Sequence, residues 1–368
     1  MPGYVLSRND MRDEEIVVYA GEGSSHSWTW LADLFESKGI LNARFVDSSG
    51  LARLLHDHRG TVIISGGDGL RIAGSFRGTI FPRLKDFIRG GGKYVGMCAG
   101  AYLPLPSSLV PLNEFNLSTT RIENIDPRVH GQNVSPRLAV GYGSCSIVHP
   151  VRGEVALRGA GLDVVAPLYG GPVFREPEKD EVVFRYHAFT EDTELQVDRA
   201  LAGSQVLGRP AVIQSRYGSG EMILLGPHLE HPRYPQANDV FLQIICSPAG
   251  RARGWLEPIP DGEHHELRAA LGDLKVAILG LENRSFLVGN KLWDGGRFLD
   301  LVAAIETRTA NLDEDTSQSV ASKLTRARTI LMDVRPDALE YSDSAPSLLV
   351  ESARECVDRH FSALRGER

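Results

Sequence analysis

The sequence predicts an α/β protein whose sheet is mostly parallel, followed by a helical C-terminal domain. In the N-terminal region, short β-branched runs alternate with helical stretches, a pattern that right-handed crossovers turn into a parallel sheet. The runs are almost continuously apolar, as in strands that are covered on both faces. Beyond residue 249 the strand signals stop and apolar residues follow helical spacing. We therefore expect two domains, 1–248 and 249–368.

The individual elements follow in chain order. The clearest expected strands are the apolar runs 16–20, 43–46, 61–65, 94–97, 182–184 and 222–225. Helices are expected near 27–38, 51–57 and 81–88, and prolines at 248, 258 and 260 mark a connector. In the C-terminal region, apolar stripes with helical spacing occur at 320–331 and 349–364. We expect residues from about 262 onward to pack as helices beside the sheet domain.

The composition excludes several classes of protein. The chain has 368 residues, 42% apolar and 24% charged, which is typical of a globular protein with two domains. Lys and Arg number 40 against 47 Asp and Glu, so no basic excess favours nucleic acid. The four cysteines are far apart, and the sequence contains neither a signal peptide nor a membrane-spanning apolar run. We expect a cytoplasmic protein with reduced thiols and with no membrane partner, metal or cofactor.

A cysteine between two glycines is the strongest local signal. Cys98 follows the expected strand 94–97, and Gly96 and Gly100 flank it in a G-x-C-x-G pattern. Small residues allow a tight strand-to-helix turn that lifts the sulfur out of the sheet, and helix-end amides favour the thiolate. A buried packing cysteine fits the same residues. The pattern alone therefore does not decide whether Cys98 is a reactive or a structural cysteine.

A histidine and a glutamate end another expected strand. His228 follows the run 222–225, and open α/β sheets place their sites at the carboxyl ends of such strands. Glu230 lies two residues further on, so in an extended segment it points to the same side as His228. We expect the Glu230 carboxylate to reach the imidazole.

A glycine-rich loop ends the third expected strand. Gly66 and Gly67 follow the run 61–65, where backbone amides face the crevice. The N–H groups of Gly67 and Ala99 are placed to hold a developing oxyanion together. Because all these segments end strands of one sheet, we expect one site centred on Cys98.

Together these segments resemble the class I glutamine amidotransferase-like superfamily, and within it the amidotransferase-like domain at the N-terminus of some biotin-protein ligases. The matching stretches span about residues 16–235 and are 18–21, 65–68, 96–102, 168–174 and 226–230. The resemblance implies a flavodoxin-like three-layer sandwich and a Cys-His-Glu triad, with Cys98 as nucleophile, His228 as base and Glu230 as its orienting group. It implies a substrate held near Gly66, Gly67, Ala99 and Tyr102. No biotin-ligase catalytic module is visible, which indicates a stand-alone relative.

Two functions of different classes follow from this resemblance. The first is a cysteine-nucleophile amidotransferase-like hydrolase, which attacks glutamine or another small amide through a thioester and has an acceptor enzyme or synthetase as partner. Glutamine-using relatives continue the elbow as G-x-C-x-G-x-Q, and Tyr102 stands at the glutamine position here. The alternative is a non-catalytic ligand-binding or regulatory protein that retains the fold. It would hold a carboxylate on the amides of Gly67 and Ala99 and contact a partner through its helical domain.

Overall fold

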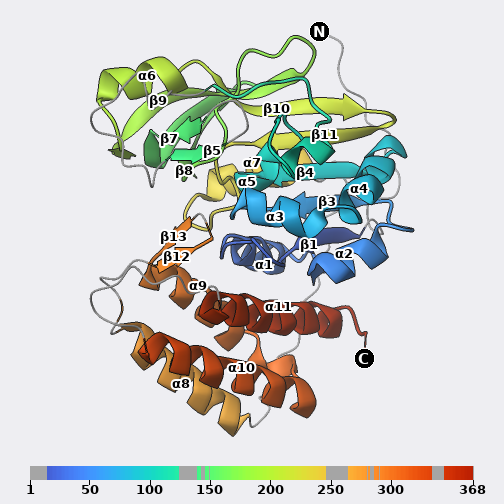
Figure 1. Cartoon of the computed structure of the whole chain (residues 1–368), viewed down its shortest axis with the longest axis vertical. Coiled ribbons are helices and arrows are strands. Elements are labelled where there is room, and N and C mark those ends of the chain that lie inside the picture. The colour runs from blue at the N-terminus through green and yellow to red at the C-terminus, as the bar shows by residue number, and fades with distance from the viewer. Residues whose placement is uncertain are drawn as a thin grey trace.

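A nine-stranded mixed sheet forms the centre of the molecule, and long C-terminal helices lie beneath it (Figure 1). The computed structural model describes residues 15–123, 139–141, 146–148, 150–245, 264–279, 281, 286–289, 291–333 and 344–367. Within them the strand order is β2-β1-β3-β4-β11-β10-β9-β7-β8. The following expected features lie outside the described residues: the boundary at 248/249, the connector prolines Pro248, Pro258 and Pro260, and Cys145 and Cys246.

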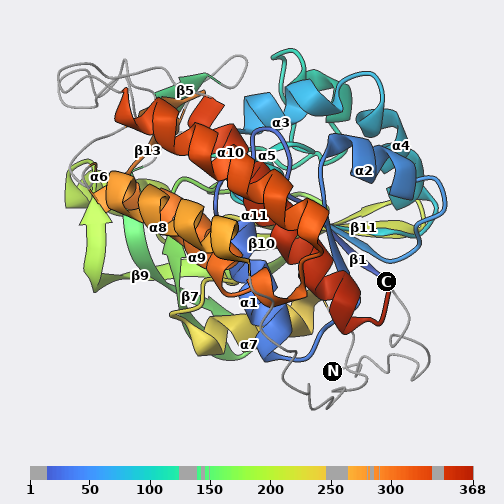
Figure 2. The same cartoon turned by 90° about the horizontal axis from the view of Figure 1, so that it is seen from below.

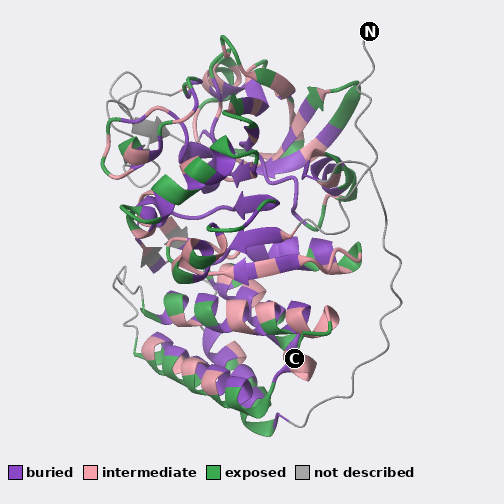
Figure 3. Ribbon diagram, turned by 90° about the vertical axis from the view of Figure 1, so that its right-hand side faces the viewer, coloured by how far each residue is buried: buried purple, intermediate pink, exposed green. Residues whose placement is uncertain are grey.

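Five parallel strands make up one half of the sheet, as the apolar runs predict. In spatial order they are β2 (Ala43–Val46), β1 (Ile16–Tyr19), β3 (Thr61–Ile64), β4 (Lys93–Met97) and β11 (Gly220–Leu225). Every residue of β1 and β3 is buried because helices cover both faces. Figure 3 shows these strands as a buried band between helical layers.

The helices of the N-terminal region are divided between the two faces. One face packs against α1 (Trp28–Ser37) and α7 (Pro235–Ile245), and the other against α2 (Ser48–Leu54), α3 (Gly69–Phe76), α4 (Ile80–Arg89) and α5 (Ala99–Tyr102). A short 3-10 turn, η1, spans Leu112–Phe115. Helix α3 was not among the predicted elements. The sequence feature that marks the start of α3 is Asp68. Its carboxylate caps the helix by accepting hydrogen bonds from the N–H groups of Leu70 and Arg71.

The other half of the sheet is antiparallel, so the expectation of a mostly parallel sheet is wrong for this half. Beyond β11 follow β10 (Pro210–Tyr217), β9 (Glu181–Leu195), β7 (Val151–Gly159) and β8 (Leu162–Leu168), with α6 (Arg199–Val206) between β9 and β10. Tight turns cause this change, because a short hairpin joins only antiparallel strands. Ala160 and Gly161, both at positive φ, connect β7 to β8, and Gly218 opens the turn from β10 to β11.

The described C-terminal region is mostly helical and packs beside the sheet, as expected. It contains α8 (His265–Leu279), α9 (Gly295–Glu306), η3 (Thr309–Asn311), α10 (Glu314–Met332) and α11 (Ser344–Leu364). Figure 2 shows α8, α10 and α11 from below, running side by side across the molecule. Two small hairpins complete the fold: β5 (Ala139–Gly141) with β6 (Ser146–Val148), and β12 (Phe286–Val288) with β13 (Lys291–Trp293).

A buried arginine fixes the C-terminal helices to the sheet domain. Arg308 is only 1% exposed, and its Nη2 lies 2.8 Å from Asp33 Oδ1 and 2.7 Å from Glu36 Oε2 on α1. Aromatic packing adds to the contact, since the rings of Phe45 and Phe361 lie 5.2 Å apart between β2 and α11. Buried apolar residues of both regions form one continuous cluster. These contacts place the β12–β13 hairpin and the start of α9 over the strand ends.

Candidate ligand pocket

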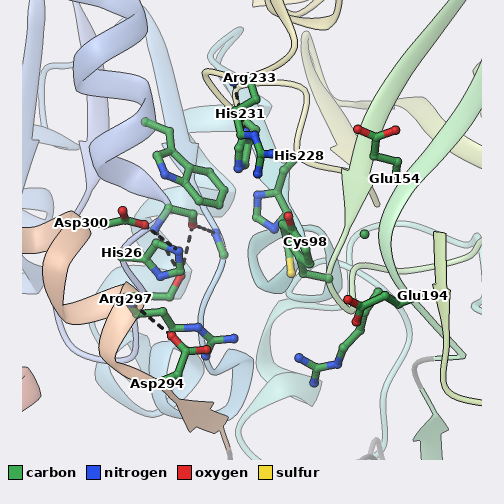
Figure 4. Close-up of a pocket in the computed structure, with 18 of the residues that line it drawn as sticks. His26, Cys98, Glu154, Glu194, His228, His231, Arg233, Asp294, Arg297 and Asp300 are labelled. Atoms are coloured by element: carbon green, nitrogen blue, oxygen red, sulfur yellow. Dashed lines mark hydrogen bonds and ion pairs between the residues drawn. The ribbon is translucent and has the colours of Figure 1, made fainter. Parts of the chain in front are cut away.

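A cavity of about 1000 Å³ opens at the carboxyl ends of the parallel strands, and we call it the Cys98 pocket. Its floor comes from the segments that follow β1, β3, β4 and β11. Its opposite sides come from β7 and β9 and from the β13–α9 segment (Figure 4). The side chains used below are His26, Cys98, Glu154, Glu191, Asp192, Glu194, His228, Lys291, Arg297 and Asp300. The C-terminal helical region therefore walls the pocket.

The turn at Cys98 has the sharp geometry that the G-x-C-x-G pattern predicts. Cys98 has φ 49° and ψ −107°, a conformation that L-residues rarely adopt and that is typical of functional turns. The flanking glycines are required sterically. A Cβ on Gly100 would lie 2.0 Å from the carbonyl oxygen of Ile64, and one on Gly96 would lie 2.5 Å from that of Gly100. The sulfur therefore lies at the pocket floor.

His228 and Glu230 form a buried pair beside the sulfur. Nδ1 of His228 lies 2.7 Å from Oε1 of Glu230, and His228 lies close enough to Cys98 for each to shift the pKa of the other. Burial lowers the pKa of His228, but the charge of Glu230 and the hydrogen bonds to Cys98 and Glu230 outweigh it and raise this pKa to about 10. His228 is therefore an imidazolium at neutral pH, with its Nδ1–H donating to Glu230.

The pKa of the Cys98 thiol is lowered, whereas that of His228 is raised. Burial raises the pKa of Cys98, but the hydrogen bond and charge of His228 and the charge of Lys291 outweigh burial and lower the pKa. Glu230 opposes this effect. Cys98 is therefore easier to ionise than a cysteine buried without these partners. The structure brings together the three residues Cys98, His228 and Glu230 that the sequence placed in one site.

The four residues predicted around a substrate have different surroundings. Gly66 and Gly67 line the pocket; the N–H of Gly66 donates to Ser27 Oγ over 3.1 Å. The N–H groups of Gly67 and Ala99 donate to no group within the described stretches of the chain. Tyr102 is buried away from the pocket lining, and its hydroxyl donates to the carbonyl oxygen of Gly170 over 3.3 Å.

Two cations from the C-terminal region reach the pocket, and sequence reasoning missed both. Lys291 in β13 and Arg297 in α9 lie close enough to Cys98 for their charges to interact with the thiolate. Burial lowers the pKa of Lys291, and the charges of Cys98 and Asp68 oppose that effect. Lys291 forms neither a hydrogen bond nor an ion pair with any described residue. No sequence motif marks these residues, because the hairpin that delivers Lys291 has only three residues in each strand.

The two sides of the pocket differ in charge. Glu154, Glu191, Asp192 and Glu194 on β7 and β9 form an acidic wall in which Arg152 is the one cation of these two strands that lines the pocket. Figure 4 shows Glu154 and Glu194 across the pocket from Arg297. On the α9 side, burial and neighbouring aspartates raise the pKa of Asp300 to about 6. His26 Nε2 lies 3.5 Å from Asp300, and burial keeps the pKa of His26 well below its usual value.

The fold and pocket define an α/β protein with a ligand cavity at the carboxyl edge of its parallel strands. The family model described as "Biotin-protein ligase, N terminal" matches residues 15–128. A biotin–protein ligase of Schizosaccharomyces pombe is 31% identical over 93 residues, which are 24% of this chain and 14% of that protein. The predicted resemblance to the N-terminal domain of biotin-protein ligases is thus confirmed. The chain spans only a small fraction of that relative.

Solved structures give weaker similarities. A cytoplasmic protein from Salmonella typhimurium matches with a TM-score of 0.36 and 10% identity over 63% of this chain and 97% of its own. A β-galactosidase from Bacillus circulans sp. alkalophilus gives a TM-score of 0.34 and 14% identity over 63% and 31%. Scores this low support no argument about function.

The expectation of a cysteine-dependent amidohydrolase is wrong. Both the family model and the curated relative are biotin-protein ligases, and neither is a glutaminase or an amide hydrolase. The site agrees with this correction. The glutamine position of the amidotransferase elbow holds Tyr102, which does not line the pocket.

Among the described residues, no helix is both long and apolar enough to cross a membrane.

Proposed function

We propose that this chain is a non-catalytic ligand-binding protein with a regulatory role, and that the Cys98 pocket binds the carboxylate of a small molecule. The observation that carries the proposal is the charge around the sulfur. Three basic side chains, those of His228, Lys291 and Arg297, lie around Cys98 at the pocket floor. His228 is paired with Glu230, whereas Lys291 has no counter-ion within 4 Å among the described residues, and an anionic ligand supplies one.

Backbone groups supply the hydrogen bonds for this carboxylate. The N–H groups of Gly67 and Ala99 have no partner within the described residues, and such unpaired amides at strand ends bind anions well. The positive φ of Gly67, +154°, is compatible with its close approach to Gly23, whose carbonyl oxygen a Cβ would meet at 2.1 Å. In this arrangement Gly67 and Ala99 bind ligand oxygens and Cys98 lies below them.

The acidic wall sets the chemistry of the far end of the ligand. Glu154, Glu191, Asp192 and Glu194 lie on the side opposite Arg297, so a donor-rich or cationic group is favoured there. Tyr234 already donates its hydroxyl to Glu154 Oε1 over 3.0 Å. The proposed ligand is therefore a small carboxylate that carries hydrogen-bond donors at its other end.

The regulatory role rests on how the pocket is built. Its walls come from both proposed domains, 1–248 and 249–368, so a bound ligand strengthens their contact. The order β2-β1-β3-β4-β11 supports a flavodoxin-like three-layer arrangement for the first domain. The relative named a biotin–protein ligase carries a similar stretch within a longer chain. This similarity supports an enzyme as the partner that recognises the ligand-bound form of this chain.

Titration calorimetry of the full chain at pH 7.5 tests the proposal, with β-alanine, 4-aminobutyrate and 5-aminopentanoate as probes. The account predicts saturable 1:1 binding of at least one probe, which Arg297→Gln weakens about tenfold by removing one charged contact. Arg359→Gln is the matched control, because Arg359 lies on the exposed side of α11 and makes only a 3.8 Å contact with Asp313. Binding that both variants weaken equally, or no binding of any probe, would contradict the proposal.

A further inference from the structure

A second cavity of about 480 Å³ lies beside the Cys98 pocket. Ser25, Gly67, Lys291 and Trp293 border both cavities. The second cavity lies between the loops after β1, β2 and β3 and the first turns of α11. Its volume falls within the range of small-molecule sites, roughly 300–1,000 Å³.

The position of this cavity is the one that the sheet topology favours for a ligand. The chain leaves β1 toward β2 on one side and then crosses to β3 on the other side of β1. The loops at the carboxyl ends of β1 and β3 therefore separate and leave a crevice. The loops 20–25 and 67–68 line the cavity at this point.

The strand-end side of the cavity is rich in hydroxyl groups and turn glycines. Ser24, Ser25, Ser48 and Ser49 line it, and Asp47 follows directly after β2. An acidic residue at the end of the second strand is the usual partner of ribose hydroxyls in doubly wound sheets. The carboxylate of Asp47 accepts from the N–H of Gly50 over 2.8 Å, which fixes its position at the cavity wall.

Three cations face this hydroxyl-rich side. They are Arg71 of α3, Lys291 of β13 and Arg354 of α11. Asp47 and Asp68 are engaged as helix caps, and the other two acids of the lining, Glu22 and Glu351, are exposed. Lys291 has no counter-ion within 4 Å among the described residues, and Arg354 Nη2 lies 3.4 Å from Asp47 Oδ2. The cations of this lining therefore offer contacts to a phosphate, and Lys291 is the one with no counter-ion within 4 Å among the described residues.

The remaining wall is apolar and comes from the C-terminal region. It consists of Val288, Trp293, Pro346 and Val350. An indole and aliphatic side chains suit a flat, uncharged ring, since aromatic surfaces stack on nucleobases. A sugar phosphate alone would leave this wall without a partner.

We propose that the second cavity binds a purine nucleoside phosphate. The base packs against the wall formed by Val288, Trp293, Pro346 and Val350. The ribose hydroxyls meet Asp47 and the serines, and the phosphate meets Lys291 and Arg71.

Titration calorimetry of the full chain tests this proposal with AMP, GMP, adenosine, ribose 5-phosphate and inorganic phosphate as separate probes. We expect 1:1 binding of AMP or GMP at least about tenfold tighter than that of any probe that lacks the base or the phosphate. Lys291→Met removes a cation and is expected to weaken nucleotide binding about tenfold. Lys275→Met is its matched control, because Lys275 pairs with Glu306 on the surface of α8.

A second variant separates this cavity from the Cys98 pocket. Ser347 lines only the second cavity, in the first turn of α11, where an acidic side chain suits the helix dipole. Ser347→Glu is expected to keep the melting temperature and weaken nucleotide binding roughly threefold or more by charge repulsion. Ser344→Glu in the same turn, outside the cavity lining, and Arg297→Gln in the Cys98 pocket are expected to leave nucleotide binding unchanged.

Several outcomes overturn the proposal. Equal affinity for AMP and ribose 5-phosphate excludes recognition of the base. Absence of binding at millimolar AMP and GMP, or binding that Lys291→Met and Ser347→Glu leave unchanged, excludes the cavity as a nucleotide site. Carboxylate binding in the Cys98 pocket is measured separately with Arg297→Gln, so either proposal can fail alone.

Discussion

Removing the charge of Glu230 is expected to destabilise the protein in a strongly pH-dependent way. The pKa of His228 rises from its usual 6.5 to about 10 in the folded protein, which corresponds to about 5 kcal/mol. The 2.7 Å contact between His228 Nδ1 and Glu230 Oε1 gives a Coulomb energy of about 6 kcal/mol at an effective dielectric constant of 20. Cys98 contributes to the same shift and burial opposes it, so Glu230 is the largest but not the whole cause. Glu230→Gln removes the charge while keeping an acceptor oxygen.

The sign of the pH dependence follows from the direction of the shift. Because the pKa of His228 is raised on folding, its stabilisation is complete below about pH 6.5 and is lost as pH rises to about 10. Urea unfolding should therefore give a loss of about 3–5 kcal/mol for Glu230→Gln at pH 6, and a much smaller loss at pH 9.5. Histidine NMR titration should show a lower pKa of His228 in the variant, since the charge of Glu230, the largest cause that raises it, is removed.

Glu191→Gln is the matched control for this measurement. Glu191 is an exposed residue on the acidic wall of the same pocket, and its substitution should change stability by no more than about 0.5 kcal/mol. A loss for Glu230→Gln that is equal at pH 6 and pH 9.5 would refute the reasoning. An unchanged pKa of His228 in the variant would refute it as well.

Three further predictions concern single positions. Arg308→Met should lower the free energy of unfolding by about 3 kcal/mol, measured in urea, because two carboxylates on α1 lose their buried partner; a change below about 0.5 kcal/mol would contradict the anchoring role. Gly100→Ala should cost at least about 2 kcal/mol, because its Cβ meets the carbonyl at the end of β3 at 2.0 Å. Gly74→Ala, in open space within α3, should instead stabilise by about 0.5–1 kcal/mol, and a reversed order in thermal melts would contradict the steric argument. Iodoacetamide at pH 7.5 should alkylate Cys98 well before Cys356. His228 and Lys291 lower the pKa of Cys98 although burial opposes them, whereas burial raises the pKa of Cys356 to about 12. Peptide mass spectrometry that finds Cys356 labelled first would contradict this order.

The sequence was most informative where local patterns decide the structure. Apolar runs located the strands β1 to β4 and β11, because continuous burial leaves a simple signature. The G-x-C-x-G turn was predictable because steric contacts exclude side chains at both glycines. The pairing of His228 with Glu230 was predicted from an extended segment, whereas the chain turns at residues 229–230 and the two side chains meet across that turn.

The rest of the site depends on contacts that no local pattern records. Lys291 and Arg297 reach Cys98 only because Arg308 and α11 fix the C-terminal helices under the sheet. The antiparallel half of the sheet was missed because hairpin turns predict paired strands but not which sheet they join. Tyr102 was placed in the site by position in a motif, whereas tertiary packing turns its hydroxyl to Gly170.

The absence of amide turnover is the central claim, and ammonia release tests it most directly. The full chain and Cys98→Ser are each incubated at pH 7.5 with glutamine, asparagine and other small primary amides, and ammonia is measured over many hours. We expect the same background rate for both proteins, because the Cys98 pocket binds its ligand without bond cleavage. Ammonia release by the full chain that Cys98→Ser abolishes would contradict it.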